Sequence, residues 1–137
     1  MKVAHLAVVL GCIAQILSAC GCPEDRAPSG IEMNLPTSLG SAAYRVEVCV
    51  DSACEDFEIT QQNTAISDDG QLEVESVSAD TLRYTSWLQI APGTHDIEVI
   101  VSDETGSIAT FDGSVEFQEI DRCHDEDSEA AIELVAA

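Results

Sequence analysis

Cysteine is the residue type that offers the most chemistry in this 137-residue chain. Cys12 lies within an apolar N-terminal run and Cys20 ends it, while the other four are Cys22, Cys49, Cys54 and Cys123. An even number of cysteines in an exported chain is typical of disulfides, and four cysteines allow three connectivities. The residues around the cysteines have to decide which sulfurs are joined.

The sequence between residues 44 and 59 favours one pairing. Residues 44–50 alternate between apolar and polar, residues 53–59 place Ala53, Phe57 and Ile59 on one parity, and Asp51-Ser52 has the length of a two-residue hairpin loop. This register places Cys49 opposite Cys54 and keeps the apolar side chains on one face, whereas a slip of one residue would separate them. Side chains at such a non-hydrogen-bonded position approach closely. We therefore predict a Cys49–Cys54 disulfide.

Elimination then pairs Cys22 with Cys123. The alternative is a zinc site, with Cys49, Cys54, Cys123 and His124 as ligands. Cys123 and His124 are adjacent in the sequence, which is too close for the usual ligand spacing. An oxidising compartment also disfavours free thiolates, so the cysteines predict disulfides rather than a metal site.

An acidic run close to the C-terminus is the remaining candidate for a metal site. Calcium takes oxygen ligands, and Asp121, Asp125 and Asp127 are weak candidates for this role. The run lacks the spacing of a calcium-binding loop, and a run of charges is usually a solvated surface. We predict no bound metal and no cofactor.

Histidine offers little evidence of catalysis. His5 lies in the apolar N-terminal run, His124 in the acidic run, and His95 follows a Pro-Gly turn, where a surface or turn role is more common than that of a general base. The sequence has no nucleophile elbow, zinc-binding helix motif or phosphate-binding glycine loop. We predict a protein that is not an enzyme.

The charge of the chain excludes one class of partner. Lys and Arg total 5, Asp and Glu total 26, and the formal net charge is −21. Phosphates would repel such a surface, so we expect no binding to nucleic acid. Anionic lipid headgroups would also repel it, so the domain should stand off a membrane.

The N-terminus indicates export. Lys2 precedes an almost wholly apolar run from Val3 to Leu17, the pattern of a signal peptide. The tetrapeptide Leu17-Ser18-Ala19-Cys20 resembles the lipobox of bacterial lipoproteins. The resemblance implies that Cys20 is diacylated and becomes the new N-terminus, and two acyl chains suffice for stable membrane anchoring. The alternative is an ordinary secretory signal with a chance cysteine.

The same resemblance implies a destination and a domain layout. Gly21 follows Cys20 where Asp would favour retention in the inner membrane, so a Gram-negative host would send the protein to the outer membrane. We divide the chain into a signal peptide (1–19), a lipidated tether (20–30) and a folded domain (31–137). The domain would lie in the periplasm or outside the cell.

Alternation with period two sets the fold class. Ile97, Val99 and Val101 share one face of an expected strand, and Pro92-Gly93 and the Asp103–Gly106 turn flank it. Residues 88–106 (L-x-I-x-P-G-T-H-x-I-x-V-x-V-x-D-x-x-G) resemble the last strands of bacterial immunoglobulin-like domains. The resemblance implies an all-β, immunoglobulin-like antiparallel β-sandwich of about seven to eight strands.

Further strands are expected in the rest of the domain. The first contains Ile31 to Leu35, another contains Leu72 to Val77, and residues 61–71 form a loop. Gly113 is expected at a bulge or bend. Residues 130–137 form an added edge strand, with an alanine-rich helical turn as the alternative.

Trp87, the only tryptophan, is the candidate interaction residue. Leu82, Tyr84, Leu88 and Ile90 share one parity of the alternation and Trp87 has the other. The pattern predicts that Trp87 is partly exposed on the outer face, where an amphipathic ring often serves as a contact anchor. The alternative is a bulge next to Trp87 that turns the ring into the core.

These observations together predict a lipid-anchored, non-catalytic lipoprotein of the cell envelope. It would act as a structural or protein-interaction module, with the membrane as one partner and an envelope or extracellular protein as another. The alternative is a ligand-binding lipoprotein that holds calcium or a small molecule in its acidic loops.

Overall fold

The computed structural model of the chain describes residues 28–40, 43–60, 63–120 and 128–137. These ranges contain ten strands and no helix, hence no helix that could span a membrane. The strands are β1 (Ser29–Asn34), β2 (Tyr44–Val50), β3 (Ala53–Ile59), β4 (Thr64–Ile66), β5 (Leu72–Ser78), β6 (Thr81–Ser86), β7 (Gly93–Asp103), β8 (Gly106–Glu119), β9 (Ser128–Glu133) and β10 (Val135–Ala136).

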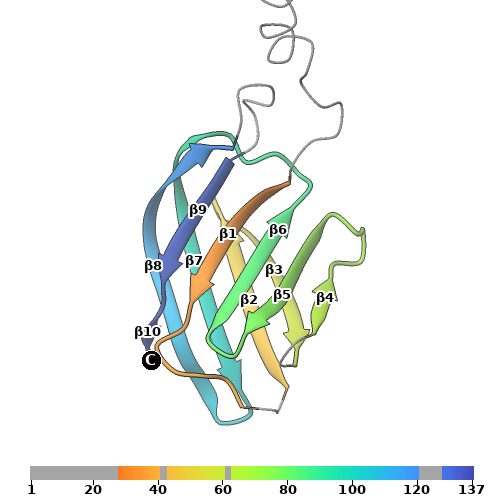
Figure 1. Ribbon diagram of the computed structural model, residues 1–137, viewed down its shortest axis with the longest axis vertical. Coiled ribbons are helices and arrows are strands. Elements are labelled where there is room, and N and C mark those ends of the chain that lie inside the picture. Colours follow the sequence, from red (N-terminus) through yellow and green to blue (C-terminus); the bar gives the residue numbers. More distant parts are fainter. Residues whose placement is uncertain (1–27, 41–42, 61–62, 121–127) are drawn as a thin grey trace, which may run out of the picture.

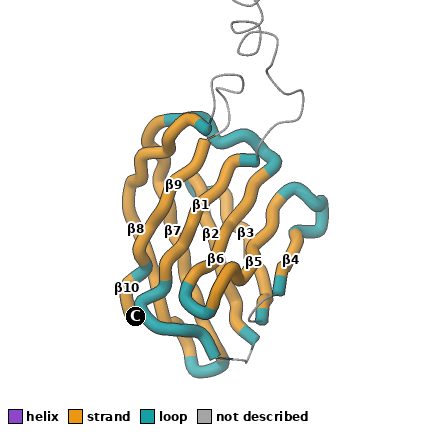
Figure 2. The backbone as a smooth tube through the Cα atoms, in the orientation of Figure 1, coloured by secondary structure: helices purple, strands orange, loops and turns teal. Residues whose placement is uncertain are grey.

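The strands form one mixed sheet in the order β3-β2-β7-β8-β9-β1-β6-β5-β4, with β10 added to β8. The sheet curls into a barrel-like shape that is nearly closed (Figure 1). Figure 2 shows that the strands run along the length of the molecule and that most of the loops gather at its two ends. Strands β3 and β4 are the two edges of the sheet.

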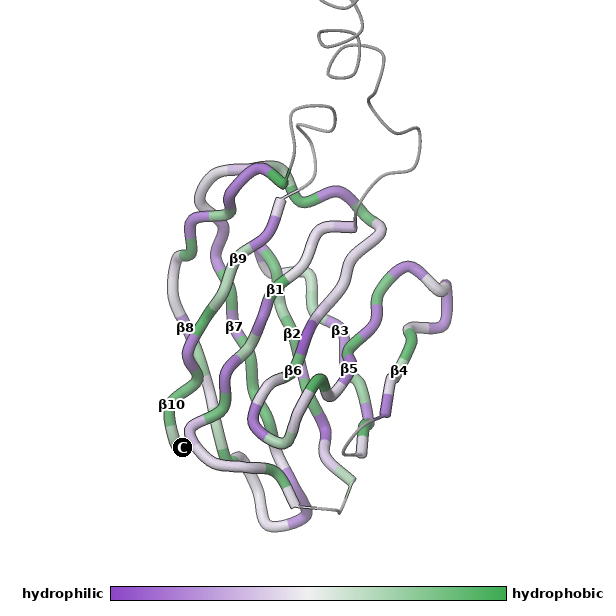
Figure 3. The backbone as a smooth tube through the Cα atoms, in the orientation of Figure 1, coloured by the Kyte–Doolittle hydropathy of each residue, from purple (hydrophilic) through white to green (hydrophobic). Residues whose placement is uncertain are grey.

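Period-two alternation builds the core. Along β7, Ile97, Val99 and Val101 are buried while Thr94, Asp96 and Glu98 are exposed, as the sequence predicts. The alternation of apolar and polar residues is visible along several strands in Figure 3. The inward side chains of β2, β3 and β7 pack against those of β1, β5 and β6 in one buried cluster. An edge-to-face contact between Phe57 and Tyr84, with ring centres 6.3 Å apart, joins β3 to β6.

The predicted hairpin register is confirmed. Cys49 pairs with Cys54 and Val46 with Phe57. Asp51 and Ser52 have φ values of 49° and 73°, because a two-residue turn that matches the twist of the strands needs positive φ at both central positions. This turn therefore fixes which residues of β2 and β3 face each other.

The prediction of a purely antiparallel sheet is wrong at one place. Strand β1 pairs with β6 in antiparallel fashion but with β9 in parallel fashion, with Ile31 opposite Ala130 and Met33 opposite Ile132. The two strands run in the same direction and put apolar residues on the same inner face. The C-terminal segment is a strand, as predicted, but β9 lies between β8 and β1 rather than at an edge.

Two smaller expectations, the loop at residues 61–71 and a bulge at Gly113, are also wrong. Residues 61–71, expected to form a loop, contain the short strand β4. Gly113 pairs regularly with Ile97, and the register of the β7–β8 pair shifts between Val101 and Ser102 instead. A Cβ atom on Gly113 would lie 3.6 Å from the ring of Phe111, so the missing side chain leaves room beside this ring.

Candidate functional site

One end of the molecule gathers the histidine, the disulfide and the exposed tryptophan. Strands β1 and β7 begin at this end, and β2 and β6 end there, because Ser29 pairs with Ser86 and Val50 pairs with Ile97 (Figure 1). We call it the entry end and define it by Ser29, Asp51, Trp87 and His95. The β7–β8 turn at Asp103–Gly106 lies at the opposite end.

His95 is held at both ring nitrogens. Nδ1 lies 2.6 Å from Oδ2 of Asp51, and Nε2 lies 2.6 Å from the carbonyl oxygen of Ala91. The ring also meets Phe117 edge to face, with centres 5.1 Å apart. Only 17% of the His95 side chain is exposed, against 52% for Asp51. The imidazole therefore bridges the β2–β3 turn and the segment that precedes β7.

The two acceptors favour one protonation state. An ionised carboxylate and a carbonyl can only accept hydrogen bonds, so a neutral imidazole can satisfy one of them and the imidazolium can satisfy both. Partial burial alone would lower the pKa of His95. The hydrogen bonds to Asp51 and Ala91, with the charges of Asp51 and Asp96, outweigh burial and raise it. The site thus favours a cation at this position.

Asp51 shows the complementary effect. Its hydrogen bond with His95 lowers the pKa of the carboxyl group, and the backbone N–H of Asp96, which donates to Oδ1 at 2.9 Å, lowers it further. The N–H of Asp51 donates to the carbonyl of Asp96 at 2.8 Å. The carboxylate and the backbone N–H of Asp51 therefore both hold the hairpin tip against β7, just beyond the last paired residues of β2.

A buried pair of serines holds the segment after Trp87. Ile90 lies outside the strands, yet its N–H donates to Oγ of Ser29 (3.2 Å) and its carbonyl accepts from Oγ of Ser128 (2.5 Å). The N–H of Ser128 also donates to Oγ of Ser29, at 3.1 Å. Both serines are fully buried. They satisfy backbone groups that would otherwise be buried without partners and join β1 and β9 to residue 90.

A cleft of about 270 Å³ opens between the hairpin tip and residues 86–90. Leu72, Tyr84 and Ile90 line its apolar part, and Asp51 and His95 line its polar part. Burial raises the pKa of Tyr84 to about 12, against a smaller lowering by its hydrogen bond with Ser86. In the part of the chain that the structure describes, no buried side-chain nitrogen or oxygen lacks a hydrogen-bond partner.

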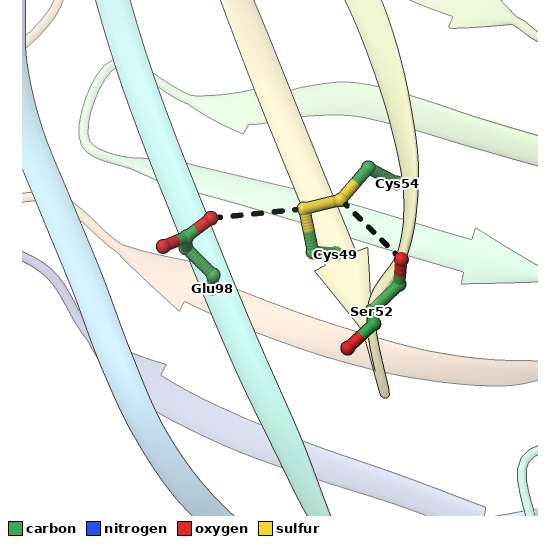
Figure 4. The surroundings of a disulfide bond; sticks show 4 residues. All are labelled: Cys49, Ser52, Cys54 and Glu98. Atoms are coloured by element: carbon green, nitrogen blue, oxygen red, sulfur yellow. Dashed lines mark hydrogen bonds between the residues drawn. A yellow bond between two sulfur atoms is a disulfide. The ribbon is translucent and has the colours of Figure 1, made fainter.

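The disulfide lies beside this cleft. Cys49 and Cys54 are bonded across the β2–β3 pair, and their Cα atoms are 4.0 Å apart. Figure 4 shows Glu98 of β7 reaching toward the bridge, with Oε1 3.8 Å from the sulfur of Cys49. Glu47 also lies near, so two carboxylates and one cysteine sulfur, three potential metal-ligand residues, meet here. The Cys49 sulfur is bonded to Cys54 and offers no thiolate, so two ligands of the zinc alternative are already engaged.

Trp87 is 44% exposed, in agreement with the exposure that the alternation predicts. The reason for this exposure differs from the predicted one. Strand β6 ends at Ser86, so Trp87 lies outside the strand and the alternation no longer applies to it. Leu88, which parity assigns to the core, is 52% exposed. The backbone N–H of Trp87 donates to the carbonyl of Gln71, and Oγ of Ser86 donates to the carbonyl of Leu88. This turn is therefore held in place by hydrogen bonds.

The remaining predicted site residues lie outside the described residues. They are Cys20, Cys22, Asp121, Cys123, Asp125 and Asp127. The roles proposed for them stay predictions, as does the interaction role of Trp87.

Comparison with known proteins adds no assignment. No family model, curated protein or solved structure matches the chain at a significant level.

The sequence did not reveal the His95–Asp51 bridge or the Ser29–Ser128 pair. The sequence pattern places Asp51 only in the turn and Ser29 in the tether. The pairing of β2 with β7 brings Asp51 to His95 across 44 residues, and local alternation carries no information on which strands become neighbours. The only signals in the sequence for this bridge are an Asp at the tip of a predicted hairpin, Asp51, and a His at the start of a predicted strand, His95.

Proposed function

We propose that the chain is a lipid-anchored, non-catalytic lipoprotein of the cell envelope that acts as a structural or protein-interaction module. The observation that carries the proposal is Leu17-Ser18-Ala19-Cys20 after a basic and then apolar leader. The Cys49–Cys54 disulfide supports it, since disulfides persist in oxidising compartments such as the periplasm and the cell surface.

The proposed architecture is a two-layered, immunoglobulin-like sandwich. The likeness concerns the layers and not the order of the strands. The motif at residues 88–106 and the single buried cluster to which β1, β2, β3, β5, β6 and β7 all contribute support it. The strand order differs from that of immunoglobulin domains, in which the first two strands are neighbours, because β1 lies beside β6 and β9. The proposed partners are the membrane, through Cys20, and an envelope protein; a Gram-negative host would place the protein in its outer membrane.

Detergent phase partition with mass spectrometry of the N-terminus tests the anchor. The expected mature chain begins at Cys20, carries acyl groups and enters the detergent phase. Cys20→Ala is expected to stay unprocessed by the lipoprotein peptidase and unacylated. Cys22→Ala is the matched control, and it keeps the acyl groups. Normal processing and acylation of Cys20→Ala would overturn the proposal.

A further inference from the structure

The entry end carries two adjacent exposed apolar side chains. Trp87 is 44% and Leu88 is 52% exposed, and we call them the Trp87–Leu88 tip. In a chain with 26 acidic residues, the segment from Tyr84 to Thr94 contains no charged residue. The tip therefore joins an amphipathic ring and an aliphatic side chain on an uncharged segment.

The tip lies where the chain enters the domain. Ser29 pairs with Ser86, so Trp87 follows a residue that sits directly opposite the start of β1. Hydrogen bonds from Trp87 to Gln71 and from Ser86 to Leu88 hold the turn, and the buried Ser29–Ile90–Ser128 contacts hold the segment behind it. Little ordering is required before the tip can meet a surface.

The length of the N-terminal chain limits how far this end can stand from a membrane. From Cys20 to Pro28 the chain advances eight residues, which span at most about 29 Å when fully extended. Strand β7 alone has 11 residues, or about 36 Å. If the acyl chains are on Cys20, the entry end is the end tethered close to the bilayer.

We propose that the Trp87–Leu88 tip contacts the lipid surface to which Cys20 anchors the protein. This inference rests on the proposed lipid anchor. Trp favours the interface because its ring is apolar while its N–H can remain hydrated, and shallow insertion buries an apolar group about 5–10 Å into the headgroup boundary. The tether makes the contact intramolecular, so a weak contact suffices. Anionic headgroups would repel the acidic remainder of the domain and hold it off the membrane, so the contact is confined to the uncharged tip and to zwitterionic lipid.

The single tryptophan makes the test direct. The full-length lipidated protein is reconstituted into phosphatidylcholine vesicles with brominated acyl chains, and the vesicles are floated on a density gradient. The expected result is that the protein floats, that its emission is blue-shifted and that it is quenched more by bromines near the headgroup than by bromines near the chain end. Replacing part of the phosphatidylcholine with an anionic lipid is expected to reduce the quenching.

Leu88→Ser is expected to reduce the quenching, while its far-ultraviolet spectrum and melting curve stay those of the parent. Val135→Ser is the matched control because Val135 is 62% exposed but lies far from the entry end. It is in β10, where it pairs with Thr110 of β8. Protein that floats with unquenched Trp87 overturns the lipid contact alone. Protein that does not float overturns the anchor, and the lipid contact with it.

Discussion

Oδ2 of Asp51 lies 2.6 Å from Nδ1 of His95, so the tip of the β2–β3 hairpin is tied to the start of β7 by a charge-assisted hydrogen bond. The two residues shift each other's pKa in opposite directions, with that of His95 raised and that of Asp51 lowered. A raised histidine pKa means that its stabilisation is complete below the ordinary value of 6.5 and is lost as the pH rises through the folded-state value. A lowered aspartate pKa means that its stabilisation is complete above 3.8 and is lost on acidification.

The first prediction is therefore a stability difference that depends on pH. The melting temperature of the parent, minus that of His95→Gln, is expected to be largest between pH 3.8 and 6.5 and to shrink above this range. Subtracting the variant removes the contribution of the many other carboxylates. The charge of Asp96 also raises the pKa of His95. The variant Asp51→Asn is therefore expected to keep part of the fall in melting temperature that the parent shows as the pH rises above 6.5. A difference that grows steadily above pH 6.5 would contradict the imidazolium bridge.

The second prediction concerns the disulfide. Peptide mapping without reductant is expected to recover Cys49 linked to Cys54. The double variant Cys49→Ser/Cys54→Ser is expected to lower the free energy of unfolding by about 2 kcal/mol, because the bridge closes a loop of only about six residues. Urea denaturation measures the loss. Recovery of Cys49 joined to Cys123 would contradict both the hairpin register and the structure.

The third prediction compares two leucines that the sequence assigns to the same face. Leu82 is fully buried and Leu88 is 52% exposed. Leu82→Ala is expected to cost about 2–5 kcal/mol through the lost burial and the cavity left behind. Leu88→Ala is expected to change the stability by no more than about 0.5 kcal/mol. Equal losses in urea denaturation would show that Leu88 belongs to the core.

Leu82 and Leu88 show how much of the fold could be predicted from the sequence, since the alternation predicts burial for both and only Leu82 is buried. Alternation placed Ile97 and Val99 in the core, and the hairpin turn placed Cys49 opposite Cys54, because both are local properties of a pleated strand. The alternation misplaces Leu88 because β6 ends at Ser86 and nothing in the alternation marks this end. The parallel contact of β1 with β9 joins residues 99 positions apart. It depends on how the whole sheet curls, so no short segment encodes it.

The candidate site divides in the same way. The Cys49–Cys54 bridge could be predicted from nearby residues. The alternation predicts the exposure of Trp87 for the wrong reason, because β6 ends at Ser86. The partners of His95 could not, since Asp51 reaches it through the neighbouring strand and Ala91 through the preceding turn. The two buried serines have no sequence signal at all, because a serine beside a strand is usually a loop residue in contact with water.

The last prediction follows from those serines. Ser29→Ala removes the acceptor for the N–H groups of Ile90 and Ser128, which would then be buried without a partner. The expected loss in the free energy of unfolding is about 1–3 kcal/mol, measured by urea denaturation. Ser114→Ala is the matched control, because its exposed hydrogen bond to Asp96 is replaced by water. If both variants lose equally little, water reaches the Ser29 position. A large loss for Ser29→Ala alone means that the folded domain begins at Ser29, two residues before the boundary predicted from the alternation at Ile31.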